Sequence, residues 1–117
     1  MRRLAIILAL LPCLAAQAAW ADELVMFERS GCSWCERWHR EVGQAYPNSS
    51  ESAQAPLRVV SLDRARPGDL KNLGPIRFTP TFVVIACGQE KGRITGYPGA
   101  MHFWGLLDSL LERPAAC

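Results

Sequence analysis

Two cysteines, Cys32 and Cys35, constrain the fold most, because they lie at the junction of two different hydrophobic patterns. Residues 24–28 form a short apolar run typical of a buried strand, and residues 32–45 carry apolar side chains at helical spacing. Cys32 is therefore expected at a helix N-terminus, where unpaired N–H groups and the helix dipole stabilise a thiolate and lower the pKa of the thiol. Cys35 follows one turn later. The pattern predicts a reactive pair in which Cys32 attacks and Cys35 resolves.

Two alternatives to redox chemistry share this C-x-x-C spacing. A zinc site needs two further thiolate or imidazole ligands. The candidates in this sequence, which are isolated from one another, are His39, His102, Cys87 and Cys117. A purely structural disulfide would close a very short loop and would restrict little entropy of the unfolded chain. A strand before the pair and a helix after it favour redox chemistry, for which we expect neither a metal nor another cofactor.

Residues 1–21 have the pattern of a secretory signal peptide. Two arginines precede an unbroken apolar run, and residues 19–21 match a small-x-small cleavage site. We expect cleavage before Asp22, with a site three residues earlier as the alternative. A retained membrane anchor is a further alternative, which is disfavoured because the apolar run is short and is interrupted by Pro12. A cleaved signal predicts a periplasmic protein.

The remaining residues, 22–117, number 117 − 21 = 96 and suffice for one small domain. Arg2 and Arg3 leave with the signal, so 13 − 2 = 11 basic residues balance 11 acidic ones. A chain of zero net charge has no basic field that would attract nucleic acid or anionic lipid. We therefore expect neither nucleic-acid binding nor membrane binding after cleavage. Disulfides persist in the oxidising compartment to which such a signal leads.

The rest of the domain alternates strand-like and helical patterns. Strands are expected at residues 57–62, 79–86 and 93–95, and helices at residues 68–73 and 100–113. Residues 48–56 are polar and lack periodicity, which predicts an exposed loop. Together with the first strand and helix, these segments predict an α/β fold in which a four-stranded mixed sheet is covered by helices.

The strand–CxxC–helix start, followed by Thr79-Pro80-Thr81 at the opening of a later strand, resembles the thioredoxin superfamily. The resemblance implies a minimal thioredoxin/glutaredoxin-like fold and a cis peptide bond between Thr79 and Pro80 that packs beside Cys32. It also implies a groove for the partner peptide, formed by Ser33, Trp34, Thr79, Pro80, Gly96 and Tyr97. For Trp34 and Tyr97, an apolar rim that contacts a partner and ordinary partial burial are both open.

Further motifs look similar to the SoxS type, the periplasmic thioredoxin-like regulators of bacterial sulfur oxidation. They include Trp38 after the cysteine pair, Tyr46-Pro47 and residues 96–99. This similarity implies a monomeric thiol–disulfide oxidoreductase that keeps cysteines of a partner protein reduced, with a sulfur-oxidation carrier as one candidate partner. Its electrons would come from a membrane thiol-transfer protein. The alternatives are a periplasmic disulfide oxidase or isomerase, and a non-catalytic thioredoxin-like binding module.

A second, structural disulfide is expected between Cys87 and Cys117. The strand that opens at Thr79 runs away from the end where Cys32 lies, which places Cys87 at the far edge. The last helix runs back toward the same edge, and the three residues after it give the tail enough reach to close the bond. A buried Cys87 with a frayed tail, whose Cys117 could pair with another molecule, is an equally open alternative.

Overall fold

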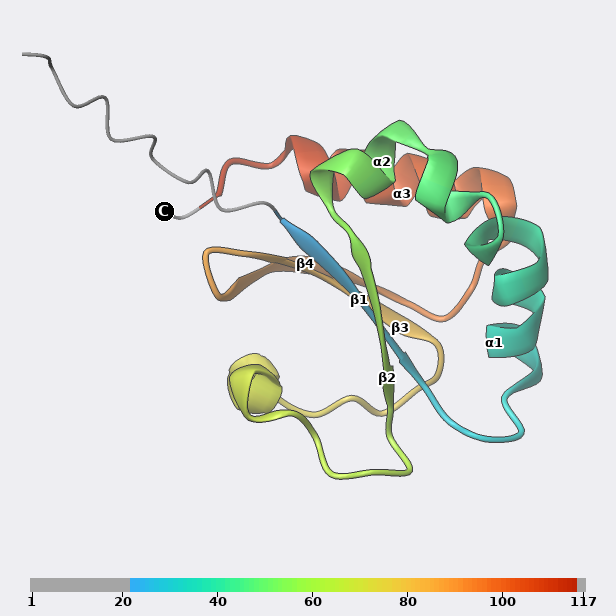
Figure 1. Ribbon diagram of the computed structural model, residues 1–117, viewed down its shortest axis with the longest axis vertical. Helices are drawn as coiled ribbons and strands as arrows, with labels where there is room; N and C mark the ends of the chain where they lie inside the picture. The colour runs from blue at the N-terminus through green and yellow to red at the C-terminus, as the bar shows by residue number, and fades with distance from the viewer. Residues whose placement is uncertain (1–21, 116–117) are drawn as a thin grey trace, which may run out of the picture.

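The computed structural model describes residues 22–115, which contain one mixed sheet of four strands. The strands are β1 (Glu23–Glu28), β2 (Leu57–Ser61), β3 (Thr81–Ala86) and β4 (Gln89–Thr95). Their order is β2-β1-β3-β4; β1 runs parallel to β2, whereas β3 is antiparallel to both β1 and β4 (Figure 1). The predicted α/β fold with a four-stranded mixed sheet is confirmed. The predicted signal peptide, residues 1–21, lies outside the described residues.

The two central strands are buried on both faces, which explains their uninterrupted apolar sequences. In β1 the side chains of residues 24–27 are fully buried, and in β3 all six residues are buried. Val, Ile and Phe fit the two-sided packing of a central strand. The strands β2 and β4 form the edges of the sheet and are partly exposed.

One face of the sheet is covered by the helices and helical turns between Cys32 and β2 and by the C-terminal helix (Figure 1). These are α1 (Ser33–Trp38), the π-helical turn η1 (His39–Gly43), the 3-10 turn η2 (Tyr46–Asn48), α2 (Ser50–Gln54) and α3 (Ala100–Glu112). Trp38 is fully buried here, with ring centroids 5.1 Å from Phe82 and 5.6 Å from Phe103. Because Trp38 belongs to α1, this aromatic cluster fixes α1 and its cysteines against the sheet.

The opposite face is covered by the 3-10 helix η3 (Gly68–Leu73), which matches the short helix predicted there. Leu24 and Met26 of β1 belong to the larger apolar core, on the side of α1 and α3. Val25 and Phe27 alternate with them along the strand and pack on the opposite face with Leu70 and Val83. The Arg66 guanidinium lies 5.6 Å from the centre of the Phe27 ring. The sheet is thus a layer between two separate apolar clusters.

The prediction of an exposed loop at residues 48–56 is wrong, because this segment contains α2. The Ser49 side chain caps the helix by accepting a hydrogen bond from the Ser52 N–H at 3.1 Å. The Tyr46 hydroxyl donates to the Ala55 carbonyl oxygen at 2.6 Å and so holds the end of the segment. A helix of five residues without an apolar stripe leaves no periodic signal in the sequence.

Several boundaries also differ from the predicted ones; β3, for example, begins at Thr81 rather than at residue 79. The helix expected at residues 32–45 is divided into α1 and η1, and β4 begins at Gln89 rather than at residue 93. Gln89 and Glu90 are exposed residues of an edge strand, so pairing with β3, and not hydrophobic alternation, sets where β4 starts. None of the helices within residues 22–115 has both the length and the hydrophobicity needed to span a membrane.

Candidate active site

Cys32 and Cys35 form a disulfide at the start of α1, with their Cα atoms 5.2 Å apart. Cys32 is the N-cap residue and has an extended backbone, with φ −84° and ψ 98°. The Cys35 N–H donates a hydrogen bond to Cys32 Sγ, at an N–S distance of 3.1 Å. Gly31 has φ +72°, a left-handed conformation that glycine adopts without strain, and it turns the chain into the helix. The hydrophobic pattern thus places Cys32 correctly at a helix start.

The two sulfurs differ in their access to solvent. Cys35 is 2% exposed and belongs to the larger core with Trp38 and Phe103, whereas Cys32 is partly exposed. Thiol–disulfide exchange requires direct contact between the attacking sulfur and the sulfur attacked. Cys32 is therefore the sulfur that a protein partner can reach first.

The loop that carries Cys32 is tied to the end of β2 by one carboxylate. Asp63 Oδ2 accepts hydrogen bonds from the Ser30 N–H at 2.7 Å and from the Ser30 hydroxyl at 2.8 Å. These bonds, the backbone bond first, hold the pKa of Asp63 below its ordinary value. The Leu62 N–H also donates to the Glu28 carbonyl oxygen at 2.7 Å, so two neighbouring contacts join the loop to the sheet.

The loop before β3 lies next to Cys32. The Thr79–Pro80 peptide bond is cis, and the Gly96 N–H donates to the Pro80 carbonyl oxygen at 2.7 Å. An open groove runs between this loop and the start of α1. Its lining consists of Arg29, Gly31, Cys32, Ser33, Trp34, Arg77, Phe78 and Thr79.

Some of the predicted groove residues line the groove beside Cys32, and others do not. Ser33, Trp34 and Thr79 line the groove, and Trp34 is 53% exposed. Pro80 is buried, and neither Pro80 nor Gly96 lines the groove. Tyr97 is 7% exposed, and its hydroxyl donates to Glu41 Oε2 at 2.6 Å. Burial, followed by this bond, raises the pKa of Tyr97 to about 12. Of the two readings left open, Trp34 fits an exposed rim and Tyr97 fits burial.

Arg77 and Phe78 are groove residues that the sequence did not single out. Their position directly before Thr79-Pro80 was the available signal, because residues that adjoin a loop packed beside Cys32 must also lie near Cys32. Phe78 is 64% exposed, although its carbonyl oxygen accepts a hydrogen bond from the Thr81 hydroxyl at 2.7 Å. The backbone is therefore held while the side chains project outward.

A second, more polar hollow lies on the Cys35 side of the disulfide. It is lined by both cysteines and by a carboxylate–imidazole pair, in which Glu28 Oε2 and His39 Nε2 are 2.7 Å apart. Glu36 also borders this hollow. Across residues 22–115, no three His, Cys, Asp or Glu side chains are grouped as a metal site would require.

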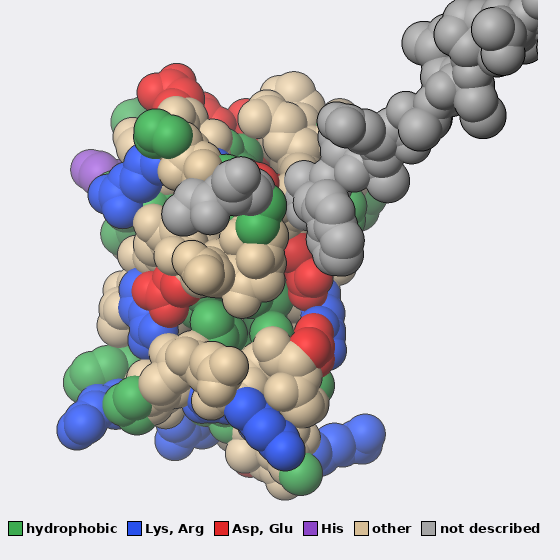
Figure 2. All heavy atoms as spheres, turned by 90° about the vertical axis from the view of Figure 1, so that its left-hand side faces the viewer, with side chains coloured by type: hydrophobic (Ala, Val, Ile, Leu, Met, Phe, Trp, Pro, Cys, Tyr) green, Lys and Arg blue, Asp and Glu red, His purple; other side chains and the backbone are tan. Residues whose placement is uncertain are grey.

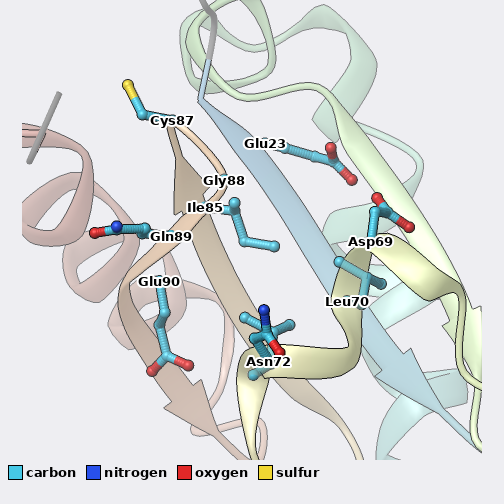
Figure 3. A pocket seen from close by; sticks show the side chains of 10 residues that line it. Glu23, Asp69, Leu70, Asn72, Ile85, Cys87, Gly88, Gln89 and Glu90 are labelled. Carbon is cyan, nitrogen blue, oxygen red and sulfur yellow. The ribbon is translucent and has the colours of Figure 1, made fainter.

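The second predicted disulfide concerns the opposite end of the sheet. Cys87 lies in the turn between β3 and β4, at the edge of a hollow of about 630 Å³ (Figure 3). Two carboxylates of this hollow, Glu23 and Asp69, pair with Arg58. Cys87 is not free in the structure. Cys117 lies outside the described residues, so the pairing of these two cysteines stays a prediction.

The sequence model of a family described as a thioredoxin-like domain matches residues 15–111, most of the chain. The chain belongs to the thioredoxin-like family. This thioredoxin-like protein is similar to a crystal structure of the periplasmic thioredoxin SoxS from Paracoccus pantotrophus in its reduced form. The two share 40% identity over 77% of this chain and 95% of that chain, with a TM-score of 0.73.

A thioredoxin from Thermus thermophilus shares the fold of this thioredoxin-like protein. The TM-score is 0.64, with 24% identity over 79% of this chain and 75% of that chain. No curated protein matches the chain. The thioredoxin-like domain and the Cys32–Cys35 disulfide together make the protein a thiol–disulfide oxidoreductase.

Proposed function

We propose that this oxidoreductase is a periplasmic reductant, which starts each cycle as the Cys32/Cys35 dithiol. The observation that supports this cycle most is the division between the two sulfurs, and the reducing direction rests on the similarity to a protein described as a periplasmic thioredoxin. Cys32 is the partly exposed N-cap residue beside an open groove, and Cys35 is buried behind it. Amide donors at the start of a helix stabilise a thiolate, so Cys32 is suited to attack and Cys35 to resolve.

The proposed cycle transfers two electrons to the partner. The Cys32 thiolate attacks one sulfur of a partner disulfide; a bond forms between Cys32 and that sulfur, and the other partner sulfur leaves as a thiolate and takes up a proton. Cys35 then loses its proton to solvent and attacks Cys32 Sγ. The bond between Cys32 and the partner breaks, and the second partner thiolate leaves and takes up a proton. The product is the disulfide seen in the structure.

The periplasmic location rests on the pattern of residues 1–21 and on the similarity to a protein described as a periplasmic thioredoxin. In an oxidising compartment the dithiol must be regenerated, and we propose a membrane thiol-transfer protein as the electron donor. The substrate is a protein cysteine in a disulfide or another oxidised form. A sulfur-oxidation carrier is the partner that the resemblance to SoxS suggests. The protein acts as a monomer and needs no cofactor.

The test measures export and turnover of the full-length chain. N-terminal sequencing of the periplasmic protein is expected to begin at Asp22. The purified protein should accelerate the reduction of insulin disulfides by dithiothreitol, and Cys32→Ser should abolish this acceleration. Ser109→Ala, on the exposed side of α3, serves as the matched control and should leave the rate unchanged. A wild-type protein without activity would favour the non-catalytic binding module.

A further inference from the structure

The groove beside Cys32 combines positive charge with exposed aromatic surface. Two of its lining residues, Arg29 and Arg77, are cations, and none of them is a carboxylate. Two others, Trp34 and Phe78, are 53% and 64% exposed. Figure 2 shows further Lys and Arg side chains at the lower end of the face drawn, which is the side of the molecule away from α1 in Figure 1.

No carboxylate within residues 22–115 pairs with the Arg77 guanidinium. Arg37, Arg58 and Arg93 each have a carboxylate partner. Within residues 22–115, Arg77 has neither an ion pair nor a side-chain hydrogen bond. The positive charge of Arg29 is partly balanced by the Asp63 carboxylate, whose pKa is lowered in part by its electrostatic interaction with Arg29. Arg77 is therefore the groove cation with the most unused capacity for an anion.

The aromatic side chains supply apolar contact area next to this charge. Trp34 comes from α1 and Phe78 from the loop before β3, so the two elements that flank Cys32 each present one ring. The Arg37 guanidinium lies 5.6 Å from the centre of the Trp34 ring, a cation–π distance that restrains the indole. Exposed aromatic residues with a nearby arginine are typical of protein contact surfaces.

The charge around the disulfide is directional. Arg29 lines both spaces beside the disulfide. The hollow on the Cys35 side adds two carboxylates, Glu28 and Glu36, of which Glu28 pairs with His39. The groove on the Phe78 side adds Arg77 and has no carboxylate. A carboxylate of a bound segment would be attracted more strongly on the Phe78 side, where cations meet no lining carboxylate, than on the Cys35 side. The local charge thus favours one kind of partner segment and one placement of it.

We propose that this groove selects a partner segment in which an Asp or Glu adjoins the reactive cysteine, with its carboxylate beside Arg77. The inference rests on the proposed function and deepens it by naming the chemistry of the substrate. Trp34 and Phe78 contact the apolar part of the segment, and the Arg77 guanidinium pairs with its carboxylate. Exposed pairs of this kind are weak, so the expected preference is about two- to fivefold in kcat/KM.

The test uses three extended peptides that are identical except for the two residues beside the cysteine, which are Glu, Gln or Lys. Each peptide is a mixed disulfide with 2-mercaptoethanol, and release of the peptide thiol by the reduced protein is followed by chromatography. Each rate is divided by the rate at which dithiothreitol alone reduces the same peptide, which corrects for differences in the intrinsic reactivity of the three disulfides. We expect the order Glu, Gln, Lys, with differences that shrink as salt rises from about 0.02 M to about 0.5 M.

Arg77→Gln is expected to lower the rate with the Glu peptide by about two- to fivefold and to leave the Gln peptide unchanged. The Gln peptide reports any change in the Cys32 thiolate itself, so the ratio of the two rates isolates recognition. Lys71→Gln removes the same charge from η3, outside the groove, and should leave that ratio as in the wild type. Phe78→Ser should slow all three peptides alike.

Equal normalised rates for the three peptides would overturn the proposal, as would equal effects of Arg77→Gln and Lys71→Gln on the ratio. Loss of selectivity and loss of redox function have different signatures in this experiment. A protein that reduces the Gln peptide but shows no charge preference retains the proposed function. A protein that reduces none of the peptides lacks the function, and the inference fails with it.

Discussion

The Asp63 carboxylate accepts two hydrogen bonds from Ser30, from the backbone N–H at 2.7 Å and from the hydroxyl at 2.8 Å. The two residues are 33 positions apart in the sequence. Ser30 belongs to the loop that delivers Cys32, and Asp63 follows β2. One carboxylate therefore connects the position of the reactive cysteine to the edge of the sheet.

Asp63→Asn should lower the stability of the protein at neutral pH, and the difference from the wild type should shrink in acid. The pKa of Asp63 is lowered in the folded state, mainly by the Ser30 N–H. Its contribution is therefore present above the pKa of the unfolded state and is lost as the pH falls through the folded value. Urea unfolding between about pH 7 and about pH 3 measures this dependence.

Ser109→Ala, an exposed substitution in α3 that removes no titratable group, is the control for this pH series. Its stability difference from the wild type should not change in the same pH range. If Asp63→Asn and the wild type differed equally at all pH values, the carboxylate would not act through its charge.

Gly92→Ala should destabilise the protein by about 1–3 kcal/mol, because β4 and α3 approach closely there. A Cβ atom at Gly92 would lie 2.5 Å from Leu110 Cδ2 and 2.9 Å from Arg113 Nη1. Both atoms end flexible side chains, which favours the lower part of this range. Gly105→Ala is the matched control within α3, where a Cβ meets no other atom within 4 Å. It should raise stability by about 0.5–1 kcal/mol, since alanine is the better helix former.

Urea unfolding at neutral pH measures both free energies. A Gly92→Ala protein as stable as the wild type would mean that α3 moves away from β4 without cost, contrary to the packing described.

The fold could be predicted from the sequence because its strongest signals are local. The β-branched run at residues 81–86 belongs to a buried strand, and the apolar periodicity after Cys32 belongs to a helix. By contrast, α2 depends on a cap by Ser49 and on the Tyr46 hydroxyl, neither of which creates a hydrophobic pattern.

The site could be predicted in part for the same reason. The C-x-x-C spacing and the Thr-Pro-Thr motif are local, and they located Cys32, Cys35 and Thr79. The bond between Asp63 and Ser30 and the unpaired state of Arg77 depend on which segments the fold brings together, so a single sequence does not reveal them. Tyr97 shows the converse, because its motif indicated a groove and its burial depends on packing against α3 and Glu41.

The direction of the reaction is tested by the reduction potential of the Cys32/Cys35 pair. A reductant should have a potential well below about −120 mV, the strongly oxidising end of the range for such proteins. In the cell the dithiol should predominate, and deletion of the proposed membrane electron donor should convert the protein to the disulfide. A potential near about −120 mV would instead indicate an oxidase.

Mass mapping of protein purified without reductant tests the predicted bond between Cys87 and Cys117. We expect a peptide that links these two residues. Such a bond closes a loop of about 30 residues, and the chain-entropy model gives about 3–4 kcal/mol of stabilisation. A disulfide-linked dimer through Cys117 would support the alternative of a frayed tail, and two unmodified thiols would rule out the second disulfide.

Trapping with Cys35→Ser tests the division of roles between the two cysteines most directly. Without the resolving sulfur, the attack by Cys32 stops at the mixed disulfide, so the variant should accumulate in the periplasm as a covalent complex with its partner. Mass spectrometry should find the bond at Cys32 and identify the partner protein. Cys32→Ser should accumulate no such complex. A conjugate through Cys35 in the Cys32→Ser variant, formed as fast as that through Cys32, would contradict the assignment of Cys32 as the attacking sulfur.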